Sequence, residues 1–472
     1  MTDPVGGTPV VHLDPDQRAR IGRAARAAMP RSAHGEWSAA ADRADPGTLL
    51  AAQETTRVPE LVPLRHERML ASPFTFYRGA AVIMSADLGA TANTGLRVQA
   101  CGDAHLSNFG GFASPDRALV FDINDFDETS PGPFEWDVKR LGASFEIAAR
   151  SRELTNKEAR ALALRAAKTY REAMADFATK TNLEVWYARF DVQRVFDEFR
   201  SQATAQEVKR FEKLTAKAQS KDNMKAFEKL TEFVDGEHRI KSDPPVVVPL
   251  RELVAGGELD EMRGWLEDRI RVYRRTLQPD RRRLLESYRL VDFARKVVGV
   301  GSVGTRCWIA LFLGRDDADP LFLQIKEAAA SVLEPYGGRS GFANHGQRVV
   351  EGQRLLQASS DILLGWIRTP GIDDVERDFY LRQLWDGKMS ADVDTMTPRA
   401  LEIYAQLCGW TLARGHARSG DRIAIASYLG SSDSFDRAIA DFSTAYADQN
   451  ERDYASVADA LEVTPTPPGA RS

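Results

Sequence analysis

The segment from Cys101 to Glu128, CGDAHLSNFGGFASPDRALVFDINDFDE, concentrates the residues of this chain that could do chemistry. It carries Asp103 in a polar turn, Asn108 five positions later, and an apolar run at 118–121 that is followed by Asp122. A short apolar run followed by an acid is typical of a buried strand with a carboxylate at its end. Two carboxylates and an asparagine in this order suit phosphoryl transfer, in which one carboxylate orients a hydroxyl while the other groups hold magnesium.

The same residues also have a purely structural interpretation. Aspartate, asparagine and glycine are common in turns, where their side chains bond to backbone groups. For any single residue of the segment this structural interpretation is the better one, whereas the spaced set as a whole favours an active site.

The spacing Asp103-x-x-x-x-Asn108, followed by Val-Phe-Asp at 120–122, resembles the catalytic loop and metal-binding aspartate of the protein-kinase-like superfamily. The wording GDAHLSN is closer to the aminoglycoside and choline phosphotransferase branch of that superfamily. The resemblance implies that Asp103 acts as catalytic base or orients the nucleophile. It implies that Asn108 and Asp122 bind Mg²⁺ and that ATP is the second ligand.

Two positions depart from the kinase pattern. Cys101 stands where a histidine usually precedes the Gly-Asp pair, and Ile-Asn at 123–124 stands where Phe-Gly often follows the metal-binding aspartate. Asp125 and Asp127 are candidates to replace Asp122 or to bind a second ion. They rank lower because Asp122 directly follows the apolar run.

Phrases spread along the chain resemble the bacterial family catalogued as domain of unknown function 2252. They are SPFTFYRGAA, CGDAHLSNFG, FDINDFDE, PFEWDVKRL and RVVEGQRLLQ. This resemblance covers most of the chain and implies no particular reaction. Within these phrases, Arg78 beside Gly79 could bring a guanidinium close to phosphate, although a surface salt bridge is the ordinary role of such an arginine. Asp137, near the start of a predicted helix, is expected to cap backbone N–H groups or to brace the catalytic loop.

A second set of chemistry-bearing residues begins two hundred positions downstream, with Gly299-x-Gly301-x-x-Gly304 between two apolar runs. A dinucleotide-binding fold uses the same glycine spacing but needs a helix directly after the third glycine. Here residues 307–312, CWIALF, form a short apolar run with β-branched and aromatic members and predict a strand. A glycine turn between two strands predicts the hairpin that covers nucleotide phosphates in kinases, with the glycine N–H groups facing the phosphates.

The next predicted strand, 321–325, presents Lys326, where a kinase-like lobe keeps the lysine that contacts nucleotide phosphates. A helix is predicted from Gln347 to Ser359, and it places Glu351 where it could pair with Lys326. Glu327 and Glu334 are less favoured partners.

Two further predicted strands, 362–367 and 379–384, bring the strand count of this lobe to five, and residues 385–388 would form the hinge that meets adenine. In an ordinary kinase these elements precede the catalytic loop, whereas here they follow it. We therefore expect an α+β, two-lobed, protein-kinase-like fold in circularly permuted order, with a small five-stranded antiparallel lobe and a large, mainly helical lobe. The helix predicted at 400–417 should then return to the Cys101 loop, and Lys326 should lie within a few ångströms of Asp122.

The predicted organisation has six parts: an N-terminal helical extension (1–61), the first part of the large lobe with the catalytic and metal loop (62–236), a linker with helices (237–290), the small nucleotide-binding lobe (291–388), the second part of the large lobe (389–462) and a disordered tail (463–472). Further helices are predicted at 14–29, 156–180, 192–216, 223–233, 259–274, 281–288 and 433–461.

The composition is that of a globular protein, with 43% hydrophobic and 28% charged residues, and 472 residues suggest two or three packed units. A net charge of −5 and a pI near 5.9 argue against non-specific binding to nucleic acid or anionic membranes. Three widely separated cysteines predict neither a disulfide framework nor a zinc site, and they fit a reducing cytoplasm. With no apolar run of about 18 residues, we expect a soluble cytoplasmic protein without a membrane partner.

The sequence therefore predicts transfer of a phosphoryl group from Mg-ATP to a hydroxyl of a small molecule or protein. Nucleotidyl transfer by the same residues and a non-catalytic ATP-binding regulatory module remain open. A metallohydrolase is a further alternative, and it would be built on Asp103, His105, Asp122 and Asp125.

Overall fold

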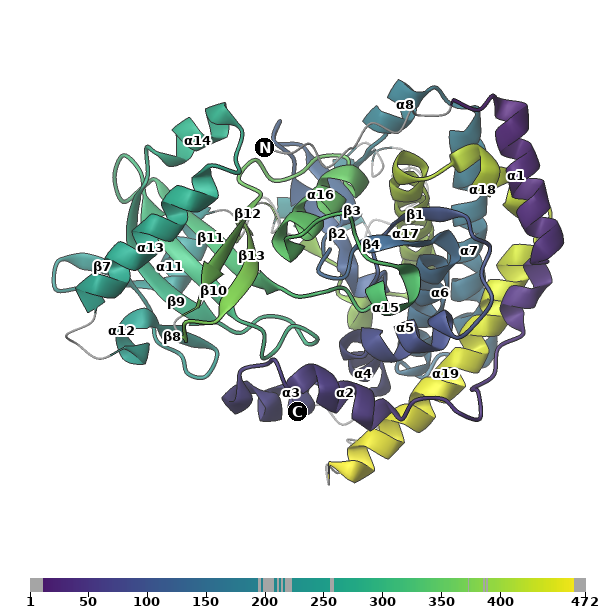
Figure 1. Ribbon diagram of the computed structural model, residues 1–472, viewed down its shortest axis with the longest axis horizontal. Helices are drawn as coiled ribbons and strands as arrows, with labels where there is room; N and C mark the ends of the chain where they lie inside the picture. Colours follow the sequence, from purple (N-terminus) through teal and green to yellow (C-terminus); the bar gives the residue numbers. More distant parts are fainter. Residues whose placement is uncertain are drawn as a thin grey trace.

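The chain forms two regions that lie side by side, one mainly helical and one built around an antiparallel sheet (Figure 1). The computed structural model describes residues 12–193, 223–254, 259–371, 373–384 and 389–461, together with positions 197, 208–209, 212–213, 215–216 and 387. Within these residues every strand pairing between named strands is antiparallel. The expected α+β class is confirmed, and the circularly permuted kinase arrangement stays a prediction.

The strand-rich region is organised around a six-stranded sheet. In spatial order its strands are β12 (Gly365–Pro370), β13 (Glu376–Gln383), β11 (Pro320–Ala328), β10 (Cys307–Leu313), β9 (Arg289–Lys296) and β8 (Val247–Pro249). The other elements between residues 223 and 356 are α11 (Asn223–Leu230), β6 (Thr231–Val234), β7 (Glu237–Ile240), α12 (Leu250–Leu253), α13 (Leu259–Arg274), α14 (Pro279–Leu285), α15 (Glu334–Gly337) and α16 (His345–Leu356).

The strands predicted at 307–312, 321–325 and 379–384 all form, and the one predicted at 362–367 begins only at Gly365. The expected count of five is wrong. The valines at 247–248 are β-branched and pair with the free edge of β9, so a segment assigned to a linker supplies a sixth strand. The proposed hinge residues 385, 386 and 388 lie outside the described part of the chain.

Alternation along the strands gives this sheet two different faces. In β10, Phe312 packs in a cluster with side chains of α13, whereas its neighbour Leu311 packs with side chains of α11. In β11, Phe322 belongs to the α11 face. The next two side chains on that face, at positions i+2 and i+4, are Gln324 and Lys326. The face thus changes from apolar to polar toward one end of β11.

The helices of the other region are α1 (Pro15–Ala28), α2 (Pro46–Glu54), α3 (Val62–Met69), α4 (Pro73–Gly79), α5 (Ala81–Gly89), α6 (Phe134–Arg150), α7 (Asn156–Thr179), α8 (Asn182–Tyr187), α17 (Pro398–Ser419), α18 (Arg422–Leu429) and α19 (Ser434–Ala460). Helices α6, α7, α17 and α19 pack on one another, and α1 packs on α18. Capping boxes begin four of the described helices, α1, α4, α7 and α8, for example with Asp14 and Gln17 at α1 and Thr155 and Glu158 at α7.

The helices predicted from about residues 14, 156, 259, 400 and 433 form within a few residues of the expected bounds. The helix predicted at 223–233 ends at Leu230, because Thr231 begins a strand that pairs with Ile240. Most of the helix predicted at 192–216 lies outside the described residues.

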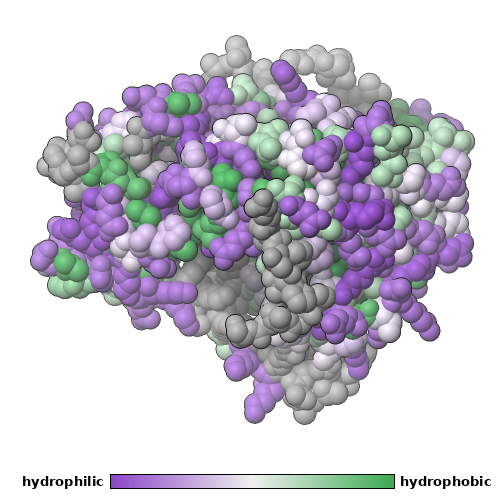
Figure 2. All heavy atoms as spheres, turned by 90° about the horizontal axis from the view of Figure 1, so that it is seen from below, coloured by the Kyte–Doolittle hydropathy of each residue, from purple (hydrophilic) through white to green (hydrophobic). Residues whose placement is uncertain are grey.

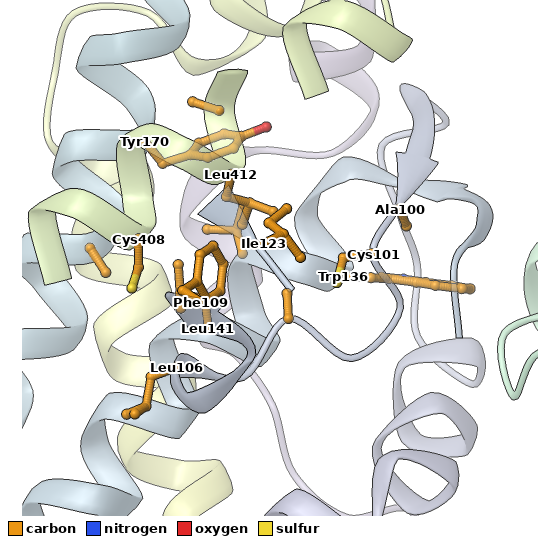
Figure 3. Close-up of a cluster of buried hydrophobic side chains, with 14 of the residues drawn as sticks. Ala100, Cys101, Leu106, Phe109, Ile123, Trp136, Leu141, Tyr170, Cys408 and Leu412 are labelled. Atoms are coloured by element: carbon orange, nitrogen blue, oxygen red, sulfur yellow. The ribbon is translucent and has the colours of Figure 1, made fainter. Parts of the chain in front are cut away.

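The Cys101 segment lies against the helical region. Strands β1 (Arg97–Ala100) and β4 (Ser130–Pro133) pair at its base, and β14 (Met389–Ser390), β2 (Phe109–Ala113), β3 (Leu119–Ile123) and β5 (Phe190–Asp191) form a second sheet in that order. Figure 3 shows Cys101, Phe109 and Ile123 in one apolar cluster with side chains of α17. Cys101 is therefore a core residue, as expected for a small apolar side chain.

The C-terminal end of α17 lies beside the start of this segment, as the sequence predicts. The Ser419 hydroxyl accepts a hydrogen bond from the backbone N–H of Gln99 at 3.2 Å. His416 Nε2 lies 3.1 Å from Asp137 Oδ2, and this carboxylate in turn contacts the Cys101 loop.

The face in Figure 2 is mostly hydrophilic, with hydrophobic side chains scattered among charged ones. In the described part of the chain, no helix is both long enough and apolar enough to cross a membrane. Cys101, Cys307 and Cys408 are all buried and free.

Candidate active site

Asp137 of α6 binds the backbone of the loop that carries Asp103. The Asp137 carboxylate accepts hydrogen bonds from the backbone N–H groups of Cys101 at 2.6 Å and Gly102 at 3.0 Å. Gly102 has a φ of +83°, and a Cβ there would lie 2.2 Å from the carbonyl oxygen of Glu128. The expected bracing role of Asp137 is thus confirmed, and only glycine fits at position 102.

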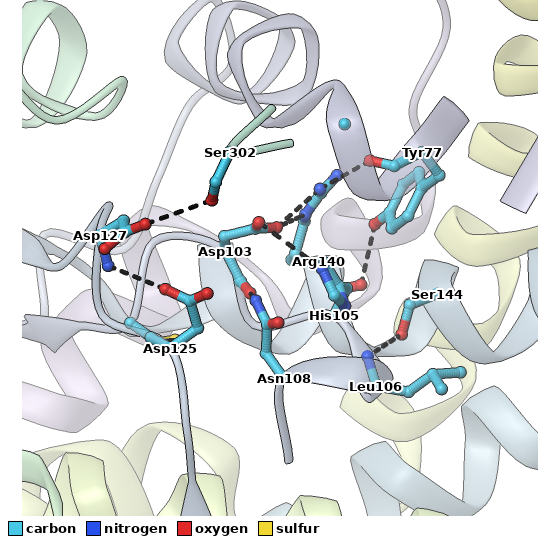
Figure 4. A network of polar contacts seen from close by, with 12 residues as sticks. Tyr77, Asp103, His105, Leu106, Asn108, Asp125, Asp127, Arg140, Ser144 and Ser302 are labelled. Carbon is cyan, nitrogen blue, oxygen red and sulfur yellow. Dashed lines mark hydrogen bonds and ion pairs between the residues drawn. The ribbon is translucent and has the colours of Figure 1, made fainter. Parts of the chain in front are cut away.

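One carboxylate oxygen of Asp103 binds Arg140 closely, and the other makes only a longer contact, with His105 (Figure 4). Asp103 Oδ1 accepts a hydrogen bond from Arg140 Nε at 2.9 Å, and Nη2 of the same guanidinium lies 2.7 Å from Oδ1 in an ion pair. Among the described residues Asp103 Oδ2 accepts no hydrogen bond, and His105 Nε2 lies 3.7 Å from it. The side chain is 20% exposed. Burial raises the pKa of Asp103, and the Arg140 guanidinium opposes that rise.

Asn108 joins the Asp103 loop to the acids that follow β3. Its Nδ2 donates to the Asp103 carbonyl at 2.8 Å, and its own carbonyl accepts the N–H of Asn124 at 2.8 Å. With Nδ2 committed as a donor, the side-chain Oδ1 is the atom available to a cation.

Asp122, predicted to bind metal, lies within β3 rather than after it, because Ile123 continues the strand. Both of its oxygens are already used. Oδ1 accepts from Arg414 of α17 and from the N–H of Ile123, and Oδ2 accepts the N–H of Ala358 at 2.9 Å. The Asp122 and Arg414 side chains are each 1% exposed. Asp122 is therefore part of a sealed ion pair, and its expected contact with Lys326 is wrong.

Lys326 instead pairs with Asp127. Its Nζ donates to Asp127 Oδ2 at 2.5 Å, and the Tyr380 hydroxyl donates to Asp127 Oδ1 at 2.6 Å. Burial would raise the pKa of Asp127, but the Lys326 ammonium and these hydrogen bonds hold it below its ordinary value. Burial would likewise lower the pKa of Lys326, but Asp125 and Asp127 raise it well above the usual range. The lysine is therefore charged in the folded protein.

The carboxylate of Asp125 accepts fewer hydrogen bonds than that of Asp127. The only donor to its carboxylate among the described residues is the N–H of Asp127, at 3.2 Å. Burial first, and then the neighbouring Asp127 charge, raise the pKa of Asp125. A cation beside Asp125 would relieve both effects, as expected at a metal-binding carboxylate.

Glu351, predicted to orient Lys326, pairs with Arg354 at 3.1 Å on the same helix, and both side chains are about one-third exposed. The prediction of a Lys326–Glu351 pair is wrong because Asp127 already occupies the lysine. Arg348 of α16 supports that arrangement by donating to the carbonyls of Asp127 and Ala329, each at 2.8 Å.

The glycine loop lies between β9 and β10 and contacts both regions. Gly299 lines a polar cavity, and the Ser302 hydroxyl lies 3.5 Å from Asp127 Oδ2. Gly301 and Gly304, predicted to face phosphates, are not part of that lining. A Cβ on Gly301 would lie 3.3 Å from the Arg78 carbonyl oxygen, and one on Gly304 would lie 3.1 Å from Arg57. These two glycines fit the loop against the N-terminal helices.

The polar cavity has a volume of about 260 Å³, and its lining includes Asn124, Asp125, Gly299, Ser302, Lys326 and Arg382. A second cavity of about 320 Å³ lies on the α13 face of the sheet and is lined mainly by apolar side chains, among them Trp265, Trp308 and Phe379. Of these two cavities, both formed by described residues, the polar one is lined by residues of both the Cys101 segment and the glycine-loop segment. We take it as the candidate active site.

The oxygen ligands near this cavity suit a Mg²⁺ ion that is bound together with substrate phosphates. They are too few for a site in which the protein alone surrounds the metal. Asn108 and Asp125 offer one amide and one carboxylate, which are the hard ligands that Mg²⁺ accepts together with substrate phosphates. In the described part of the chain no three His, Cys, Asp or Glu side chains converge as a metal site. The metallohydrolase alternative also loses Asp122, which faces Arg414.

Comparison with known proteins identifies the family. The family model described as "Uncharacterized protein conserved in bacteria (DUF2252)" matches residues 57–460. The chain belongs to this family. The matched range contains both halves of the site, from Asp103 to Asp127 and from Gly299 to Lys326. Neither the curated proteins nor the solved structures yield a match.

Arg140 and Tyr380 are site residues that sequence reasoning missed. A signal for Arg140 was present, because it lies three residues after Asp137 on one helix, and residues at that spacing share a face. If Asp137 faces the catalytic loop, Arg140 must face it as well. No comparable signal marks Tyr380, which reaches Asp127 only because β13 pairs with β11.

Proposed function

We propose that this protein transfers a phosphoryl group from Mg-ATP to a hydroxyl group. The observation that carries the proposal is the meeting of two distant segments at one polar cavity. One segment lines the cavity with Asn124 and Asp125, and its Asn108 bonds both to Asn124 and to the Asp103 carbonyl. The other segment brings Lys326 and the glycine loop. Phosphoryl transfer uses a carboxylate with an oxygen available to the acceptor hydroxyl, hard oxygen ligands for a metal ion, and a buried cation.

In the proposed reaction Asp103 Oδ2 accepts the hydrogen bond of the acceptor hydroxyl, while Arg140 fixes the other carboxylate oxygen. The hydroxyl oxygen forms a new bond to the γ-phosphorus, and the bond from that phosphorus to the bridging oxygen breaks. The hydroxyl proton passes to Asp103 and ADP leaves with the electron pair of the broken bond. General-base assistance of this kind contributes about 10²- to 10⁴-fold.

Asn108 and Asp125 would hold Mg²⁺, which when bound neutralises charge on the β- and γ-phosphates. Lys326 supplies a further positive charge, and its position is set by Asp127 and Tyr380. In this scheme Asp127 takes the orienting role that the sequence assigned to Glu351. The polar cavity would take the nucleotide, with Gly299 and Ser302 at its edge.

The proposal is tested by product analysis. Purified protein is incubated with Mg²⁺, a bacterial cell extract as acceptor source, and ATP labelled at either the γ- or the α-phosphate. We expect γ-label in an acceptor together with ADP, and a loss of at least 100-fold in Asp103→Asn. The matched control is Asp116→Asn, which removes an exposed aspartate of the same segment that pairs with Arg189.

Each other outcome has a defined meaning. Transfer of α-label with release of pyrophosphate would show nucleotidyl transfer. ATP binding without turnover of either label would show a binding module, and equal activity in wild type and Asp103→Asn would overturn the role of Asp103.

A further inference from the structure

Arg78, the last residue but one of α4, lies between the Asp103 loop and the glycine loop. Its carbonyl oxygen is the backbone atom that the Gly301 position approaches most closely. Its guanidinium carbon lies 5.9 Å from the centre of the Phe74 ring. The Arg78 charge opposes the rise in the pKa of Asp103. Burial lowers the pKa of His105, and the charges of Arg78 and Arg140 lower it further. Arg140, which binds Asp103, also donates to the carbonyl of Tyr77 at 2.8 Å, so Arg78, the next residue, lies beside the Asp103 loop.

This guanidinium has no partner in the described part of the chain. None of its nitrogens makes a hydrogen bond or ion pair, and Nε is buried without an acceptor. The other arginines at the site are all occupied. Arg140 binds Asp103, Arg348 donates to three carbonyls, and Arg382 donates to Gln324 and to the Asn124 carbonyl.

A partly buried guanidinium without an anion is unfavourable, because the charge loses water and gains nothing in return. Positions of this kind mark places where an anionic ligand completes the structure. A guanidinium also presents its N–H groups as a planar fork that fits two phosphate oxygens at once. Lys326 cannot fill this role alone, since Asp127 already holds it.

We propose that Arg78 binds the reacting phosphate of the nucleotide, that is, the phosphate group that lies over Asp103. This inference rests on the proposed function and adds a residue to it. Arg78 donates hydrogen bonds to two non-bridging oxygens of that phosphate and stabilises the negative charge that they carry during transfer. The closeness of Gly301 to the Arg78 backbone lets the glycine loop and Arg78 meet the same phosphate.

The test compares the affinities of wild type, Arg78→Ala and Arg78→Lys for ATP, ADP and AMP in the presence of Mg²⁺, measured by calorimetry. The matched control is Arg150→Ala, because Arg150 is partly buried among acids of the helical region and far from the site. Thermal unfolding of each variant confirms that it is folded. The transfer assay described above then separates kcat from KM.

We expect Arg78→Ala to weaken ATP binding roughly 10- to 100-fold while ADP and AMP binding are unchanged, as for loss of a charge-assisted contact to the γ-phosphate. The ATP affinity of Arg78→Lys should lie between those of wild type and Arg78→Ala, since lysine keeps the charge but lacks the paired N–H donors of the guanidinium. The kcat of both variants should fall. Loss of affinity for AMP as well would place the α-phosphate over Asp103 and still support the role of Arg78.

If Arg78→Ala binds all three nucleotides as wild type does and keeps its kcat, the proposal for Arg78 is wrong while the proposed function stands. If wild type itself binds no nucleotide, the proposed function is wrong and the Arg78 inference falls with it.

Discussion

Asp122 and Asp125 lie three residues apart on one segment, yet their surroundings are opposite. Asp122 is enclosed by Arg414 and two backbone N–H groups, so both of its carboxylate oxygens already accept hydrogen bonds. Asp125 lines a polar cavity and receives a single long hydrogen bond from Asp127. Asp122 is buried and Asp125 is half-buried, and burial raises the pKa of both carboxylates, so a raised pKa alone does not mark a functional carboxylate. What separates them is whether the protein itself has satisfied the charge.

The largest expected effect concerns Asp125. Asp125→Asn should lower phosphoryl transfer on the order of 100-fold or more, because a metal that polarises phosphate is worth several kcal/mol. Asp122→Asn should leave transfer per folded molecule unchanged. Both rates are measured with γ-labelled ATP at a temperature where both variants are folded. A larger loss of transfer in Asp122→Asn than in Asp125→Asn would reverse the comparison.

The second effect concerns stability. Asp122→Asn leaves Arg414 charged and unpaired in the core, and breaking a buried pair in this way costs about 3–5 kcal/mol. Urea unfolding should show this loss, and the double variant with Arg414→Met should recover much of it, because no buried charge then remains. If the double variant is no more stable than the single one, the ion pair is not the source of the loss.

Glu128, the last residue of the same segment, is an intermediate case. It is half-buried, and among the described residues its carboxylate accepts one N–H, from Val332, and forms no ion pair. Burial raises the pKa of Glu128 to about 7. Because the folded state then holds a proton that the unfolded state has released, stability should fall as pH rises from about 4.5 to about 7.

The size of this pH effect follows from the shift, and it is at most on the order of 3 kcal/mol, because solvent reaches the half-buried Glu128 carboxylate. Glu128→Gln should remove most of this dependence, as measured by urea unfolding across that pH range. A wild-type stability that rises steadily over the same range and an unchanged profile in Glu128→Gln would contradict the assignment.

The smallest effect concerns Glu351. Its contact with Arg354 is a half-exposed pair within one helix, worth about 0.3–0.5 kcal/mol. Glu351→Ala should therefore leave ATP affinity unchanged, whereas Asp127→Asn should weaken it by releasing Lys326. If instead Glu351→Ala weakened ATP binding tenfold and Asp127→Asn did not, the sequence-based pairing would be restored.

Much of the fold could be predicted from local sequence. Glycine and proline positions, apolar alternation and capping residues placed four of the sheet strands and most of the long helices. The sixth strand was not predicted because only three of its residues, Val247 to Pro249, pair with β9. The Pro-Pro step shortly before them suggested a linker. The site segments were found by residue type and spacing, and the family match covers both of them.

The sequence by itself determined which kinds of groups this protein brings to its site: an acid followed by an asparagine, a cluster of further acids, a glycine loop and a lysine. It did not determine which acid meets which cation. Lys326 and Asp127 are 199 residues apart, and Arg414 and Asp122 are 292 apart. Such partnerships depend on how β11, α17 and the Cys101 segment pack together, and local propensity carries no information about that packing. The tertiary structure therefore decided that Asp122 is enclosed in an ion pair, that Asp127 binds the lysine, and that the buried Nε of Arg78 has no acceptor among the described residues.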